Sequence, residues 1–158
     1  MEIKDHSKIL ICGISGAGKT TLARKLSQQY GYRPLHLDNY FWMENWTKRP
    51  EDEFFSLLDQ ETEKDQWILE GALLKVVRRY VGKADIIIWM KPHRLVAIYR
   101  ILKRVLTNYG KVREEFAPGC YERFDIEFLK WVWNYPKNKD AELAKIFHET
   151  RAKVVIIK

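Results

Sequence analysis

A glycine-rich run near the N-terminus carries the residue types best suited to chemistry. Residues 13–21 read Gly-Ile-Ser-Gly-Ala-Gly-Lys-Thr-Thr and match the pattern G-x-x-x-x-G-K-[ST], directly after a predicted strand and before a predicted helix. Glycines let a backbone approach phosphate oxygens closely, and the amides of such a loop face an anion at the positive end of the following helix. We interpret the run as a phosphate-binding loop for ATP, in which Lys19 reaches the β- and γ-phosphates and the Thr20 hydroxyl binds Mg²⁺. The predicted nucleotide contacts in this loop are Gly13, Ser15, Gly16, Ala17, Gly18, Lys19, Thr20 and Thr21.

Two carboxylates end predicted strands and could serve the same site. Glu70 ends the run Trp-Ile-Leu-Glu, and at the carboxyl end of a strand beside the loop it would hold Mg²⁺ together with Thr20. Asp38 ends the run Leu-His-Leu-Asp, where it would bind an acceptor hydroxyl or take its proton. Each has an ordinary structural alternative, since Glu70 could open the next helix and Asp38 could form an Asx-turn or a helix cap.

Arginines supply the third part of the predicted site. Arg100 and Arg104 are four residues apart on one long predicted helix, so they share a face and could stabilise charge on a transferred phosphoryl group. Arg113 lies in the aperiodic stretch 107–124, which we interpret as a lid that excludes water. The alternatives are solvated arginines and an ordinary surface loop. The histidines show no ligand spacing and are expected to be structural: His6, His36, His93 and His148.

An α/β domain must position these residues. Continuous apolar runs predict strands that are covered on both faces, at 8–13, 34–38, 67–70, 85–90 and 153–157. Helical spacing predicts helices between them, at 19–30, 50–64, 72–80, 93–109, 125–134 and 140–150. This alternation predicts a parallel sheet whose strands are joined by right-handed crossovers.

Length, composition and charge narrow the class of protein. With 158 residues, 46% hydrophobic and 31% charged, the chain is expected to form one globular domain. No apolar run is long enough to cross a bilayer and the N-terminus does not read as a signal peptide, so we expect no membrane span and a cytoplasmic location. The two cysteines are too few for a disulfide framework or a zinc site. A net charge of +7 suits nucleic acid, an anionic membrane surface or a phosphate-rich ligand, and does not choose among them.

Stretches well beyond the loop resemble small P-loop kinases related to adenylate kinase, and among these the DNA topology modulation proteins. The matching stretches are 13–26, 35–42 with Trp46 and Arg49 after it, 67–71, 99–104 and 119–131. The resemblance implies a P-loop NTPase fold with a five-stranded parallel sheet of order 2-3-1-4-5 and helices on both faces. It also implies a segment at about 39–66 that covers the acceptor, and a mobile lid at about 107–124 that brings arginines to the phosphates.

The sequence departs from this group in two places. Ala72 and Leu73 stand where the group commonly has Asn-Tyr, so the polar contacts of that pair to an acceptor are missing. The printed sequence also ends after the fifth strand, where relatives continue into an adenine-covering segment, and we therefore expect weak selection of the donor base.

Two functions remain open from the sequence. The first is an ATP- and Mg²⁺-dependent kinase for a small acceptor such as a nucleotide or nucleoside, acting as a monomer or homodimer. The second is a regulator that binds DNA through its positive surface and uses nucleotide as a switch. Nothing in the sequence resembles a recognition helix with base-reading side chains, which disfavours the second.

Overall fold

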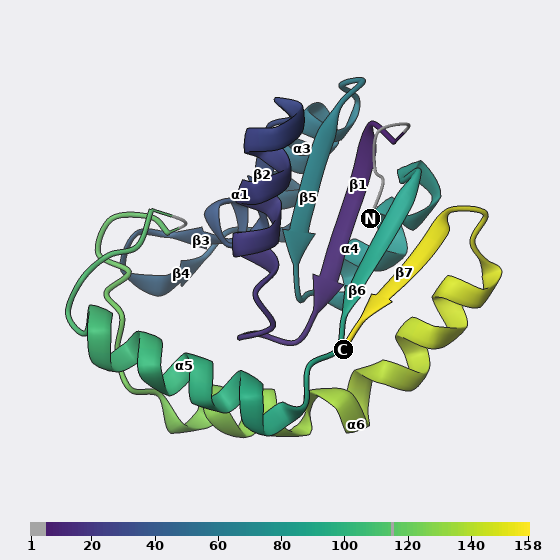
Figure 1. Cartoon of the computed structure of the whole chain (residues 1–158). Coiled ribbons are helices and arrows are strands. Elements are labelled where there is room, and N and C mark those ends of the chain that lie inside the picture. Colours follow the sequence, from purple (N-terminus) through teal and green to yellow (C-terminus); the bar gives the residue numbers. More distant parts are fainter. Residues whose placement is uncertain (1–5, 115) are drawn as a thin grey trace.

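The computed structural model describes residues 6–114 and 116–158, which alternate strands and helices around one sheet (Figure 1). In chain order the elements are β1 (Lys8–Gly13), α1 (Lys19–Tyr30), β2 (Pro34–His36), α2 (Leu37–Phe41), β3 (Trp42–Met43), η1 (Glu44–Trp46), β4 (Thr47–Lys48), α3 (Glu51–Thr62), β5 (Trp67–Gly71), α4 (Leu74–Tyr80), η2 (Val81–Lys83), β6 (Ile86–Met90), α5 (Arg94–Asn108), α6 (Ile126–Glu149) and β7 (Lys153–Ile157).

The main sheet has five parallel strands in the order β2-β5-β1-β6-β7. Counted along the chain within this sheet, the order is 2-3-1-4-5, which confirms the predicted fold class and strand order. Because β1 lies in the middle, the glycine-rich loop that follows it leaves the sheet between β5 and β6. Strands β2 and β5 end next to that loop, as the position of ligand sites in open parallel sheets requires.

Both faces of the sheet are covered, which explains the continuous apolar runs of its strands. Ile9 and Ile11 point to one face, where they pack with Ala23 of α1. Leu10 and Cys12 point to the other face, whose buried cluster includes residues of α3, α4, α5 and α6. Figure 1 shows α1 on one side of the sheet and α4 and α6 on the other. Among the described residues, no helix combines the length and apolar character that crossing a membrane requires.

Two differences from the sequence-based prediction go beyond shifts of one or two residues at the ends of elements. Strand β2 ends at His36 and α2 begins at Leu37, so Asp38 lies in the first turn of a short helix and not at a strand end. The helices predicted at 125–134 and 140–150 are one continuous helix, α6, which contains Pro136. Figure 1 shows α6 running alongside α5 and then turning up beside β7. The missing N–H of Pro136 removes one backbone hydrogen bond and allows this change of direction without ending the helix.

The segment that follows helix α5 contacts the antiparallel β3–β4 hairpin (Figure 1). The Asn45 amide donates to the Pro118 carbonyl at 3.3 Å, and the Trp46 amide donates to Cys120 Sγ at 3.3 Å. The Cys120 thiol donates in turn to the Met43 carbonyl at 3.3 Å, and the Trp46 and Phe116 rings lie 4.9 Å apart. We call this set of interactions the lid–hairpin contact.

Candidate active site

The glycine-rich loop is tightly packed between β6 and α5. Gly13 has φ +135°, and a Cβ there would lie 2.1 Å from the Met90 carbonyl oxygen. Gly16 has φ +81°, and its Cβ would lie 2.5 Å from the Ala97 carbonyl oxygen. Helix α1 begins directly after Gly18, and within the described part of the chain no side chain caps it. Its first amides are therefore free to bind an anion.

Lys19 is folded back over the loop. Its side chain donates from Nζ to the Ile14 carbonyl oxygen at 2.9 Å, and the residue is only 8% exposed. Burial lowers the pKa of Lys19, while the nearby carboxylates of Glu70 and Asp38 act in the opposite direction. A poorly hydrated ammonium group of this kind gains strongly from contact with phosphate oxygens.

Glu70 lies at the end of β5, beside the start of α1. Its Oε1 accepts from the Thr20 hydroxyl at 2.9 Å and from His36 Nδ1 at 2.8 Å. Burial acts to raise the pKa of Glu70, but the hydrogen bond from His36, the charge of Lys19 and the hydrogen bond from Thr20 outweigh it, so the pKa is lowered. Helix α4 begins only at Leu74, so Glu70 is not the first acid of that helix.

The Thr20–Glu70 pair fits the preferences of Mg²⁺ for hard oxygen donors. No group of three or more potential metal ligands among His, Cys, Asp and Glu occurs within the described residues. A Mg²⁺ ion at this pair would therefore take most of its ligands from phosphate and water, which is its usual behaviour in nucleotide sites.

Asp38 faces the same group of charges from α2. Burial among the surrounding residues and the charge of Glu70 raise the pKa of Asp38 to about 6, against an opposing effect of Lys19, Arg113 and Arg104. Asp38 is nevertheless accessible to solvent, which weakens this rise in its pKa. The N-cap of α2 is His36, so Asp38 does not cap this helix.

The predicted arginines divide into two groups. Arg100 donates from Nη1 to the carbonyl oxygens of Ala17 at 3.2 Å and Gly16 at 3.4 Å, so it contacts the backbone of the loop. Arg104 and Arg113 both contact the carboxylate of Glu122. Of the remaining loop residues, Ser15 is half-buried in the turn, and Thr21 is exposed on α1.

Two polar residues at this site escaped the sequence analysis. His36 was expected to be structural, but it lies opposite Glu70 in the β2–β5 register and donates to it. The sequence signal that could have identified His36 was its position two residues before Asp38 in a predicted strand. Glu122 lies in a stretch without periodicity, and no sequence feature pointed to its two arginine partners.

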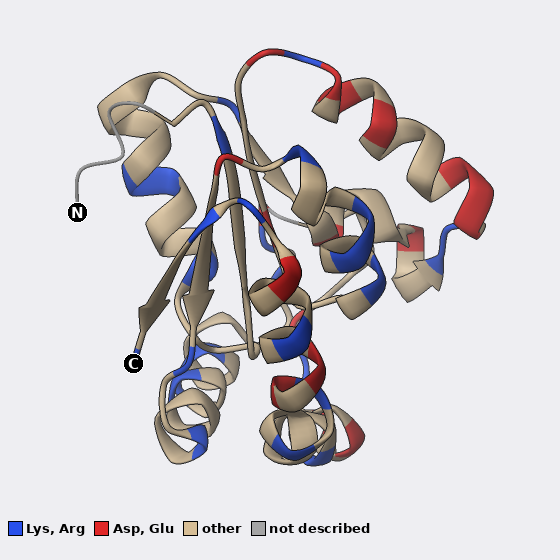
Figure 2. Ribbon diagram, turned by 90° about the vertical axis from the view of Figure 1, so that its right-hand side faces the viewer, with Lys and Arg blue, Asp and Glu red and all other residues tan. Residues whose placement is uncertain are grey.

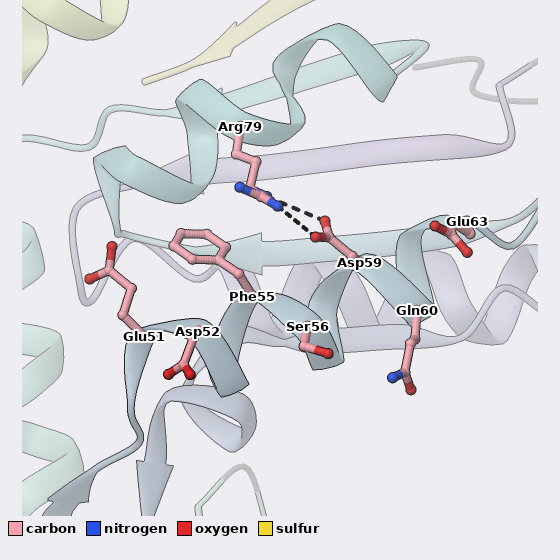
Figure 3. Close-up of a pocket in the computed structure, with 8 residues that line it drawn as sticks. All are labelled: Glu51, Asp52, Phe55, Ser56, Asp59, Gln60, Glu63 and Arg79. Atoms are coloured by element: carbon pink, nitrogen blue, oxygen red, sulfur yellow. Dashed lines mark hydrogen bonds and ion pairs between the residues drawn. The ribbon is translucent and has the colours of Figure 1, made fainter.

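A surface hollow beside α3 has none of these residues in its lining (Figure 3). Four of its lining side chains are acidic, and Asp59 is paired with Arg79 at 2.6 Å. Such an acidic surface repels phosphate. The Asp59–Arg79 ion pair joins α3 to α4. The lining residues are Glu51, Asp52, Phe55, Ser56, Asp59, Gln60, Glu63 and Arg79.

The fold and the loop define a P-loop nucleotide-binding domain of the α/β class. The chain belongs to the AAA domain family, which matches residues 9–110. It is 29% identical over 143 residues to the uncharacterized protein YqaC of Bacillus subtilis (strain 168), covering 89% of this chain and 79% of that protein.

Solved structures of small-molecule kinases share the fold. The shikimate kinase of Acinetobacter baumannii in complex with shikimate superimposes with a TM-score of 0.64 at 16% identity, covering 99% of this chain and 85% of the kinase. The deoxyadenosine kinase of M. mycoides with dCMP and dCDP has a TM-score of 0.58 at 17% identity, covering 96% of this chain and 90% of the kinase. A gluconokinase of Sinorhizobium meliloti 1021 has a TM-score of 0.51 at 14% identity, covering 96% of this chain and 82% of the gluconokinase. The similarity to DNA topology modulation proteins stays a prediction.

Proposed function

We propose that this protein is an ATP- and Mg²⁺-dependent phosphotransferase that acts on a small hydroxylated acceptor, such as a nucleoside or nucleotide. The observation that carries the proposal is the position of Asp38 in the first turn of α2, where its carboxylate lies within electrostatic reach of Lys19, Glu70 and two arginines. A switch that only binds nucleotide has no need for a carboxylate at this place. A kinase needs one to orient its acceptor.

In the proposed reaction, the loop amides and Lys19 hold the β- and γ-phosphates, and Thr20 with Glu70 would hold Mg²⁺. The metal, when bound, neutralises charge on the β- and γ-phosphate oxygens. Asp38 accepts a hydrogen bond from the acceptor hydroxyl and takes its proton as that oxygen attacks the γ-phosphorus. The bond between the γ-phosphorus and the bridging β-phosphate oxygen breaks, and ADP leaves. His36 keeps the Glu70 carboxylate ionised and oriented through its Nδ1–H.

Arginines of α5 and of the segment after it complete the proposed site. Arg104 and Arg113 would balance the charge of the transferring phosphoryl group, while Arg100 would hold the loop through the Gly16 and Ala17 carbonyls. The segment after α5, in which the Pro118 carbonyl already accepts a hydrogen bond from the hairpin, would exclude water from the reacting phosphorus.

A γ-³²P transfer screen tests the function. The acceptor panel contains nucleosides, nucleoside monophosphates and deoxynucleosides, together with shikimate and gluconate, since kinases of such acceptors share the fold. We expect one class of acceptor to become labelled. ATP hydrolysis without a labelled acceptor would contradict the proposal.

Lys19→Ala is the matched variant for this screen, and Lys25→Ala, an exposed lysine of the same helix, is its control. Lys19→Ala is expected to weaken ATP binding by about tenfold or more in calorimetry, the effect of losing a charge-assisted hydrogen bond, and to abolish transfer. Lys25→Ala is expected to change neither. Unchanged ATP affinity in Lys19→Ala would remove Lys19 from the phosphate site.

A further inference from the structure

Glu122 is a buried acid in the segment after α5, and it joins two arginines from different parts of the chain. Its side chain is 9% exposed. Arg113 Nε lies 2.9 Å from Oε2, Arg104 Nη2 donates to Oε1 at 3.2 Å, and Arg104 Nε lies 3.1 Å from Oε2. The arginine side chains are themselves mostly covered, with exposures of 27% for Arg104 and 23% for Arg113. This arrangement differs from a surface ion pair, which solvent would weaken.

The backbone fixes the position of this carboxylate. The Glu122 amide donates to the Lys111 carbonyl at 2.8 Å, and the Glu122 carbonyl accepts from the Gly110 amide at 2.9 Å. Val112 and Tyr121 pair in an antiparallel bridge next to these bonds. Glu122 therefore sits on a short two-stranded stem that begins where α5 ends.

The two arginines lie near the charged groups beside the phosphate-binding loop, because the charge of Arg104 acts on Lys19 and the charges of both arginines act on Asp38. Arg104 follows Arg100 by one helical turn on α5, and Arg100 contacts the loop carbonyls of Gly16 and Ala17. Arg104 Nε lies 3.1 Å from Glu122 Oε2 but does not complete a hydrogen bond among the described residues, so Glu122 holds this guanidinium mainly through charge. Guanidinium groups beside a phosphate-binding loop are suited to an oxygen-rich anion.

We propose that Glu122 is a positioning residue that holds Arg104 and Arg113 together beside the phosphate-binding loop, so that their positive charge stabilises the phosphoryl group in transfer. This inference rests on the proposed function. Without Glu122, two guanidinium groups and Lys19 would repel one another, and the arginines would turn out to solvent. With it, the pair is already assembled before nucleotide arrives, so no reorganisation is needed during transfer.

The test compares binding of MgADP alone with binding of MgADP plus aluminium fluoride, which mimics the transferring phosphoryl group and needs no known acceptor. In the wild-type protein, aluminium fluoride is expected to tighten the binding of MgADP. In Glu122→Gln, this gain is expected to fall by about tenfold or more, while the affinity for MgADP alone changes by less than about twofold. Glu114→Gln, at a lid acid whose side chain is 90% exposed, is the matched control and is expected to keep the full gain.

A second comparison separates positioning from a general structural role. If Glu122 acts through the arginines, Glu122→Gln causes no further loss in an Arg104→Ala, Arg113→Ala background. A further loss there, an undiminished gain in Glu122→Gln, or the lack of any gain in the wild type would each overturn the inference. Failure of the wild type to bind MgADP would instead refute the proposed function itself. If Glu122→Gln does not fold, the same binding comparison is made with Glu122→Asp, which keeps the charge on a shorter side chain.

Discussion

Burial determines how the individual charged groups at this site behave. Lys19 and Glu70 are 8% and 6% exposed, and neither could stay ionised at such positions alone. They compensate each other, because the charge of each favours the ionised form of the other. Removing either one would leave an uncompensated buried charge, and we attribute the tight hydrogen bonding of Glu70 to this requirement.

Asp38 leads to a prediction about pH. Its raised pKa means that the carboxylate gains a proton as the pH falls toward about 6, well above the ordinary value of 3.8. Phosphoryl transfer by the wild type is therefore expected to decline on the acidic side at a higher pH than an ordinary aspartate would cause. Asp38→Asn should lower transfer and remove this acidic limb, and pH profiles of kcat/KM measure both effects.

The raised pKa of Asp38 also predicts how Asp38→Asn changes the free energy of unfolding. A raised pKa makes the charged form unfavourable in the folded state, so this substitution is expected to stabilise the protein at neutral pH and to have no effect below the ordinary pKa. Asp52→Asn, at an exposed acid of α3, is the control. Urea unfolding at several pH values checks this, and destabilisation at neutral pH would contradict it.

The phosphate loop could be predicted at the scale of residues, whereas the partners of its acids could not. The spacing of Gly13, Gly18 and Lys19 is local, and a local pattern can be read directly. The bond between His36 and Glu70 depends on β2 lying next to β5, which joins positions 34 residues apart. No spacing rule contains that information.

Among the elements, the lid–hairpin contact is under local strain. Asn45 and Trp46 have φ of 55° and 60°, a conformation that costs a residue with a side chain about 1 kcal/mol or more. Gly119 has φ +76°, and a Cβ on it would lie 2.3 Å from Asn45 Oδ1. The contact therefore needs both an unusual hairpin backbone and a residue without a side chain opposite it.

Gly119→Ala is expected to open the lid–hairpin contact. The new methyl group would collide with Asn45, so the amide protons of Asn45 and Trp46 should exchange faster with solvent, by about tenfold or more. Gly110→Ala is the matched control, because Gly110 has φ +70° but no atom of the described residues lies within 4 Å of its Cβ position. Hydrogen exchange measures both variants, and equal protection in the two would refute the predicted collision.

Most elements agree with the sequence-based prediction, and the exceptions have physical reasons. Helix α1 spans Lys19–Tyr30 as expected, because Gly31 ends it in a left-handed conformation. Helix α6 was divided in error, because a proline inside a helical pattern usually marks an end. Here Val132, Tyr135 and Leu143 are buried on both sides of Pro136, and this packing keeps the helix continuous.

The charge of the whole molecule is unevenly distributed. Residues 51–65 contain seven acids and one lysine, so the rest of the chain holds 27 basic and 14 acidic residues. Figure 2 shows the acids gathered along α3 and the loop after it, with basic residues on α4, α5 and α6. Part of the positive surplus belongs to the candidate site through Lys19, Arg104 and Arg113, and this part does not form an open surface for DNA.

Salt dependence tests the alternative function as a DNA-binding regulator. We expect duplex DNA to bind weakly, without dependence on nucleotide, and to be released by roughly 200 mM salt, because the remaining charge provides only non-specific contact. Fluorescence anisotropy with a labelled duplex, with and without a non-hydrolysable ATP analogue, measures this. Affinity that changes with the nucleotide and survives at this salt concentration would favour the regulator.

The central place of β1 has a consequence for biosynthesis. The phosphate loop lies at the start of the chain, but β1 pairs with β5 and β6, and the loop glycines pack against Met90 and Ala97. A nascent chain therefore carries the complete glycine motif long before it can form the anion cradle. The ability to bind nucleotide should appear on the ribosome only after α5 has emerged, so an unfinished chain would not sequester ATP.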